Sequence, residues 1–175
     1  MNTPDYTKAG LKLFDVRTYY DDRGFFCELW RDEKLALETG ISSWGQANLS
    51  RSKKNVLRGL HYQVAPHAQA KLIMVTHGKV WDLCVDLRKD SPTYKKSFSF
   101  ELSSEKPQIL FIPNYFAHGF CVLSESADFF YRCSELYDPA CERGLLWNDK
   151  SLDIKWPIEN PIISQRDLEW VAGSI

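Results

Sequence analysis

The sequence predicts an all-β fold, a sandwich or a barrel in which most neighbouring strands run antiparallel. Apolar runs of strand length follow one another from residue 71 to residue 137, and short clusters of turn residues separate them. The clusters are His77-Gly78, Asp90-Ser91-Pro92, residues 103–107 and residues 124–126. This spacing is close to that of sandwiches and barrels, so we expect a continuous, mostly antiparallel sheet.

The chain is long enough for one domain with a substantial core. It has 175 residues, of which 44% are hydrophobic and 14% aromatic. A chain of this size is most simply a single domain, here residues 1–175, and its apolar content excludes a disordered chain.

The first forty residues predict a hairpin and a helix. Residues 12–16 are expected to form one strand, the YYDDRG sequence a turn, and the FFCELW sequence the returning strand. Residues 32–39, DEKLALET, predict a short helix with Asp32 as its cap and Gly40 as its end.

The stretch from Gln46 to Lys71 gathers polar residues where a small domain usually places core. A strand through residues 56–62 alternates its faces, which puts Arg58 on one side and His61 on the other. His61 is either a satisfied core imidazole or, with Arg58, part of the wall of a polar cavity. Gly59 would let a ligand approach the backbone closely.

The run KVWDLCVDLR predicts a strand with two different faces. Val80, Asp82, Cys84 and Asp86 share one face, and Trp81, Leu83 and Val85 share the other. Asp82 therefore faces either solvent or a polar barrel interior. Beyond Tyr137 the periodicity fades, and we expect irregular segments with a short C-terminal helix packed on the barrel.

Composition excludes several classes of partner. The net charge is -1 and the charges are scattered, so the sequence predicts no nucleic-acid or membrane-surface binding. The N-terminus lacks the features of a signal peptide and no 18-residue apolar span occurs, which predicts a cytoplasmic protein. Five cysteines, at spacings that match no zinc or thioredoxin motif, predict free thiols in a reducing compartment.

The remaining polar residues favour acid–base chemistry. No two of the four histidines stand at HxH or HxxxH spacing, so we expect no metal, and no GxSxG or glycine-rich phosphate motif is present. His61, Lys71, Tyr131 and Tyr137 can exchange protons or carry charge, although for each taken singly a structural role is the favoured interpretation. The guanidinium groups of Arg23, Arg51, Arg58 and Arg166 suit a pyrophosphate.

Six sequence motifs, taken together and in this order, are specific enough to indicate one protein family. They are DDRGFF at 21–26, QANLSRS at 46–52, VLRGLHYQ at 56–63, PHAQAKL at 66–72, IPNYFAHGF at 112–120 and YDPACERGLLWND at 137–149. Together they resemble the dTDP-4-dehydrorhamnose 3,5-epimerase family, over about residues 13–167. The resemblance implies a cupin-like jelly-roll barrel with a few short helices, a homodimer, and no metal or other cofactor. It further implies inversion of C3 and C5 of dTDP-4-dehydro-6-deoxy-D-glucose, a step toward dTDP-L-rhamnose.

The resemblance also implies residue roles. His61 would be the base, Asp167 would orient its imidazole, Lys71 would stabilise the enolate oxygen, and Tyr131 would be the acid on the opposite face of the sugar. The residues implied to bind substrate are Arg23, Phe26, Glu28, Gln46, Asn48, Arg58, His118, Tyr137, Glu142 and Arg166. Tyr137 would stack on thymine or donate a hydrogen bond.

Three other functions stay open at this point. The same catalytic groups would serve an epimerase that inverts only C3 or only C5. The second is a barrel that binds a nucleotide sugar without turnover, or a purely structural domain. The third is a metal-dependent cupin oxygenase or isomerase.

Overall fold

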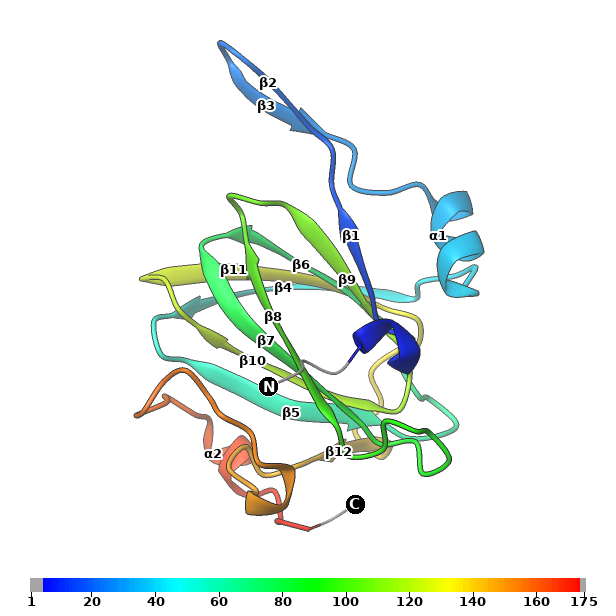
Figure 1. Cartoon of the computed structure of the whole chain (residues 1–175), viewed down its shortest axis with the longest axis vertical. Helices are drawn as coiled ribbons and strands as arrows, with labels where there is room; N and C mark the ends of the chain where they lie inside the picture. The colour runs from blue at the N-terminus through cyan, green and yellow to red at the C-terminus, as the bar shows by residue number, and fades with distance from the viewer. Residues whose placement is uncertain (1–4, 174–175) are drawn as a thin grey trace.

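Two five-stranded antiparallel sheets face each other and form the body of the molecule (Figure 1). The computed structural model describes residues 5–173. The first sheet has the order β1 (Lys12–Asp15), β9 (Gln108–Ile112), β6 (Lys71–His77), β11 (Ser126–Cys133) and β4 (Gln46–Lys53). The second has the order β12 (Glu142–Gly144), β5 (Leu57–Gln63), β10 (Phe116–Val122), β7 (Lys79–Asp86) and β8 (Ser97–Ser103). The predicted all-β jelly-roll fold is confirmed.

The main core lies between the two sheets. Phe129 of β11 stacks on Phe120 of β10 with ring centroids 4.1 Å apart, which joins one sheet to the other. Val80 and Cys84 of β7 are fully buried in this core, whereas Leu83 and Val85 pack on the outer face of the same sheet. The predicted division of this strand into two faces is confirmed.

Short helices and irregular segments cover the outer faces. α1 (Asp32–Thr39) places Leu35 against the outside of the first sheet. The C-terminal segment, with the 3₁₀ turn η2 (Lys150–Leu152) and α2 (Gln165–Leu168), lies against the second sheet. Another 3₁₀ turn, η1 (Tyr6–Ala9), precedes β1. The expected short C-terminal helix is therefore present.

Three local predictions need correction. The N-terminal hairpin is formed by β2 (Thr18–Asp21) and β3 (Gly24–Cys27), while β1 pairs instead with β9. α1 begins at Asp32 and ends at Gly40 as expected, but its cap residue is Arg31, which makes no side-chain capping bond. The long apolar run after Gln108 is divided into β9 and β10 by a tight turn. Alternation predicts a strand, but it does not identify the partner of that strand.

Near Gly59 the regular alternation of side chains along β5 is interrupted by a shift in register. His118 pairs with His61 and Phe120 pairs with Arg58, so β5 carries one more residue than β10 over this interval. Gly59 has φ +129°, and an added Cβ would lie 2.5 Å from the Cα of Gly119. The irregularity brings Arg58 and His61, which strict alternation places on opposite faces, to the same cavity.

Candidate active site

One cavity of about 340 Å³ lies between the two sheets, a size that suits a small ligand. Its walls come from β5 and β10 on one side and from β4, β6 and β11 on the other, and β12 and α2 stand at its rim. The structure brings together these predicted site residues: Gln46, Asn48, Arg58, His61, Lys71, His118, Tyr131, Tyr137, Glu142, Arg166 and Asp167.

His61 and Asp167 form a hydrogen-bonded pair in the lining of this cavity. Nε2 of His61 lies 2.7 Å from Oδ1 of Asp167, whose other oxygen accepts the backbone N–H of Gly59 at 3.3 Å. Burial raises the pKa of Asp167, but the hydrogen bond and charge of His61 and the Gly59 N–H outweigh it, so the net pKa is lowered. An ionised carboxylate only accepts hydrogen bonds, so Nε2 carries a proton, and in the neutral imidazole the lone pair is on Nδ1.

Trp170 closes the outer side of this pair. Its ring meets the imidazole of His61 edge to face, with centroids 6.4 Å apart. Gly144, the cross-strand partner of His61, leaves the space that Trp170 fills, since a Cβ there would lie 2.2 Å from the indole. The C-terminal segment therefore shields His61 from the side away from the cavity.

Lys71 reaches the same cavity from the opposite sheet. Its Nζ donates to the backbone carbonyl of His61 at 3.4 Å. Loss of hydration lowers the pKa of Lys71, and the nearby groups Cys133, Cys84 and Asp82 oppose that shift only in part. A poorly solvated ammonium group that lines the same cavity as His61 is suited to meet negative charge that develops on a bound ligand.

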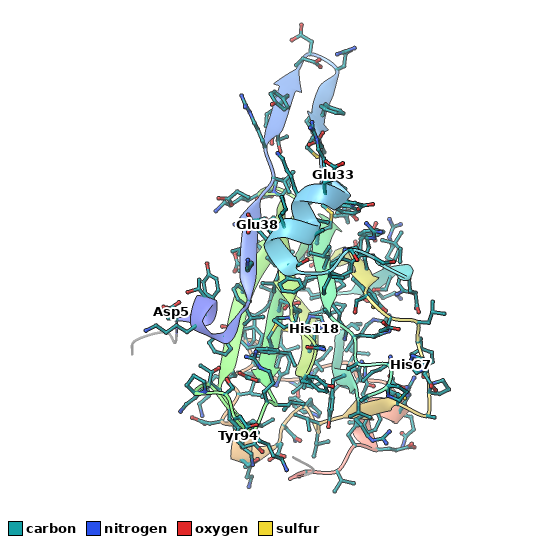
Figure 2. The ribbon with its side chains drawn as sticks, turned by 90° about the vertical axis from the view of Figure 1, so that its right-hand side faces the viewer. Asp5, Glu33, Glu38, His67, Tyr94 and His118 are labelled. Atoms are coloured by element: carbon teal, nitrogen blue, oxygen red, sulfur yellow. The ribbon has the colours of Figure 1, made fainter. Side chains whose placement is uncertain are left out.

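A second histidine–carboxylate pair lies deeper in the barrel. Nε2 of His118 is 2.8 Å from Oδ2 of Asp82, and both side chains are buried, with His118 at the centre of the strands in Figure 2. Burial lowers the pKa of His118, and Asp82 opposes the shift. The open question about Asp82 is thus resolved, because its carboxylate faces a polar interior.

Tyr131 stands on the wall opposite His61. It belongs to β11, whereas His61 belongs to β5, and both line the cavity between them. Burial raises the pKa of Tyr131, so its hydroxyl stays protonated to a higher pH than an exposed phenol does. This placement allows the two groups to act on opposite faces of one ligand.

Polar residues at the rim are linked to one another. The hydroxyl of Tyr137 donates to Glu142 at 2.8 Å, and Arg166 contacts both Tyr137 and Glu142. Gln46 accepts the backbone N–H of Tyr137 at 2.7 Å and donates to Asn48 at 2.9 Å. Elsewhere in the lining, Nε of Arg58 donates to the buried hydroxyl of Ser52 at 3.0 Å.

Three predicted binding residues lie away from this cavity. Arg23 pairs with Asp21 in the hairpin turn, Phe26 is 67% exposed, and Glu28 pairs with Arg31. The β2–β3 hairpin that carries Arg23 and Phe26 projects from the body in both views (Figures 1 and 2). The structure of one chain does not bring these residues to the other site residues, so their contact with substrate stays a prediction.

Other lining residues were not predicted individually. They are Ser50, Tyr62, Gln63, Gln69, Gly119, Phe120, Phe129, Cys133 and Ser164. Gln63 and Gln69 fall inside two of the six motifs, and that membership is the only signal that points to them. Arg51, considered for a pyrophosphate, instead pairs with Asp128 at 2.6 Å.

Within residues 5–173, no three His, Cys, Asp or Glu side chains are grouped to hold a metal ion. No helix in that range has the length and apolar character needed to cross a membrane.

One family model and several known proteins are similar to this chain. The family model described as dTDP-4-dehydrorhamnose 3,5-epimerase matches residues 7–173. A Shigella flexneri protein of that name is 45% identical over 157 residues, covering 89% of this chain and 87% of its own length. A Streptomyces niveus protein, 37% identical over 84% of this chain and 72% of its own, is named a dTDP-4-dehydrorhamnose 3-epimerase.

Solved structures agree with these matches. A Bacillus anthracis dTDP-4-dehydrorhamnose 3,5-epimerase with TDP and PPi bound has a TM-score of 0.91 and 40% identity, with 98% of each chain covered. A Legionella pneumophila dTDP-6-deoxy-D-glucose-3,5-epimerase in complex with dTDP-4-keto-L-rhamnose has a TM-score of 0.85 and 42% identity, covering 90% of this chain and 84% of that one.

Proposed function

Because the chain belongs to the dTDP-4-dehydrorhamnose 3,5-epimerase family, we propose that it inverts C3 and C5 of dTDP-4-dehydro-6-deoxy-D-glucose. The product is dTDP-4-dehydro-L-rhamnose, and the chain is an isomerase. One observation about the site carries the mechanism: His61 and Lys71 reach one cavity from opposite sheets.

The reaction begins with removal of a proton from carbon. C3 and C5 both neighbour the C4 ketone, so loss of either proton sends the C–H electron pair toward the C4 oxygen as an enolate. We assign the proton to Nδ1 of His61, with Asp167 stabilising the imidazolium that forms. The ammonium of Lys71 donates to the enolate oxygen and lowers the barrier.

Inversion requires the new proton to arrive from the other face. Tyr131, on the wall opposite His61, is the proposed donor. Its phenolate then regains a proton from solvent, and His61 releases the one it took. The same groups act once at C3 and once at C5.

The rim residues are proposed to hold the nucleotide. Arg58 would bind the diphosphate, and Tyr137 would contact the thymine, by stacking or through its hydroxyl. Gln46, Asn48, His118, Glu142 and Arg166 complete the proposed contacts in this chain. The proposal includes no metal or other cofactor, and full activity after chelation and dialysis is its check.

We propose a homodimer in which the hairpin of one copy reaches the cavity of the other. In the hairpin, Tyr20, Phe25 and Phe26 are each 64–72% exposed to solvent. They form an apolar surface that nothing in the described part of the same chain covers. A second copy would also bring Arg23, Phe26 and Glu28 to substrate.

Sedimentation velocity tests the assembly. The wild type should sediment as a dimer, and Phe25→Ser should weaken the dimer, because it removes exposed apolar contact area. Leu37→Ser removes an exposed apolar residue from α1 and should leave the dimer unchanged. A monomeric wild type would contradict the dimer.

We also propose that residues 1–175 act as one domain in the cytoplasm. All five cysteines are free, which agrees with a reducing compartment.

Turnover in deuterated water tests whether one or two centres are inverted. Deuterium should enter the product at both C3 and C5, because each inversion replaces a carbon-bound proton with one from solvent. NMR of the product locates the label. Label and inversion at one position only would support the alternative, an epimerase of one centre of this or a related dTDP-4-keto-6-deoxysugar.

A further inference from the structure

Three glutamine side chains hold the backbone of residues 135–138. Gln69 donates to the carbonyl of Glu135 at 2.8 Å, and Gln63 donates to that of Leu136 at 3.1 Å. Gln46 accepts the N–H of Tyr137 at 2.7 Å. This segment lies outside the regular strands, so side-chain amides provide the hydrogen bonds that a neighbouring strand would otherwise supply.

Gln63 makes the most contacts of the three. It lies on β5 and is 3% exposed. Its Nε2 donates to the carbonyls of His67 at 2.6 Å and Leu136 at 3.1 Å, and its Oε1 accepts the N–H of Asp138 at 2.8 Å. Both amide hydrogens are therefore used within the protein.

In the chain, Tyr137 lies between Leu136 and Asp138, and Gln63 binds a backbone group of each. Its hydroxyl donates to Glu142, whose Cα is paired with that of Gln63 across β12 and β5. We propose that Gln63 is a positioning residue that fixes Tyr137 and thereby the affinity for the nucleotide half of the substrate. The inference rests on the proposed function, because it takes Tyr137 to contact the nucleotide.

The experiment compares dTDP binding by isothermal titration for the full-length wild type and two variants. Gln63→Leu removes three hydrogen bonds, and Gln63→Glu places a carboxylate against two carbonyl oxygens. Each should weaken dTDP binding by about tenfold or more, since buried polar groups of the segment lose their partners. KM for the dTDP-sugar should rise in parallel, while kcat stays within about threefold, because the variants leave His61, Lys71 and Tyr131 in place.

Acid should restore binding in one variant only. Burial and the two facing carbonyls raise the pKa of a carboxyl at position 63, so it gains a proton as the pH falls and again donates a hydrogen bond. The ratio of variant to wild-type Kd should therefore shrink between about pH 8 and pH 6 for Gln63→Glu and stay constant for Gln63→Leu. A role in packing alone does not predict this difference.

The wild type must be measured at each pH because other charged groups face the segment. His67, at the edge of the molecule in Figure 2, lies 3.7 Å from Glu135 and 3.8 Å from Asp138. Glu142 and Arg166 face Tyr137 from β12 and α2. The ratio removes any pH dependence that the wild type and the variant share.

Two further variants keep the test decisive. Gln108→Leu removes a hydrogen-bonded amide from β9, where it donates to Asp15, and should bind dTDP as the wild type does. Gln69→Leu removes one bond from the same segment and should weaken binding in the same direction, which tests the inference if Gln63→Leu does not fold. Folded Gln63 variants that bind dTDP like the wild type would overturn the inference alone, whereas a wild type that binds no dTDP would overturn the proposed function.

Discussion

His61→Ala should lower kcat for the dTDP-keto sugar by roughly 10²–10⁴-fold, the usual contribution of a general base. The imidazole is held by Asp167 at 2.7 Å and shielded by Trp170, so no other group in the cavity occupies its position. Affinity for dTDP should change little, because the loss is at the sugar end of the site. Steady-state kinetics and calorimetry measure the two effects separately.

His77→Ala is the matched control. His77 is an exposed histidine at the end of β6, outside the cavity lining. Its loss should leave kcat unchanged. If His61→Ala kept the activity of the wild type, the base would have to be another residue.

Lys71→Met should lower kcat by about 10²–10³-fold, as loss of one oxyanion donor does. Methionine keeps most of the volume of the side chain and removes its charge, so the enolate loses its donor while the cavity stays filled. Lys79→Met is the control, since Lys79 pairs with Glu101 at the surface. Equal losses in the two variants would show that removing a charge anywhere has this effect and would contradict the role of Lys71.

The pH dependence gives a second measure of Lys71. Desolvation lowers its pKa below the ordinary 10.5, and the proposed donation to the enolate oxygen requires the protonated form. Activity should therefore fall as the pH rises through this lowered pKa, before an exposed lysine would lose its proton. Burial moves the pKa of Tyr131 upward, so Tyr131 does not account for a fall at the lower pH. The alkaline limb should be absent from the residual activity of Lys71→Met.

Much of the fold could be predicted because the local signals agree with one another. Strand length, alternation and turn residues identified most strands, and the two faces of β7 were predicted correctly. The choice between solvent and a polar interior for Asp82 had stayed open. The end of α1 at Gly40 followed from the left-handed conformation that glycine adopts easily.

The partners of the strands, and the register shift near Gly59, could not be predicted in the same way. Whether residues 12–15 pair with β3 or β9 depends on contacts almost a hundred residues apart, which alternation does not record. The extra residue near Gly59 depends on the close approach of Gly119 from another strand. As a result, Arg58 and His61 share a cavity although their spacing predicts opposite faces.

The site was predicted mainly through the family resemblance. Taken singly, His61, Lys71 and Tyr131 were better explained by structural roles. Gln63 was missed because its function depends on backbone groups of residues 136 and 138, which carry no side-chain signal in the sequence. Arg23 and Phe26 were predicted from a clear motif, but within one chain neither residue lines the cavity.

The most direct test follows deuterium leaving C3 and C5 of labelled dTDP-4-dehydro-6-deoxy-D-glucose in ordinary water, by NMR. The wild type should release the label and invert both centres. Tyr131→Phe keeps the base and should release label while the configuration is largely retained, whereas His61→Ala should retain the label. Release of the label by His61→Ala at the rate of the wild type would contradict the account.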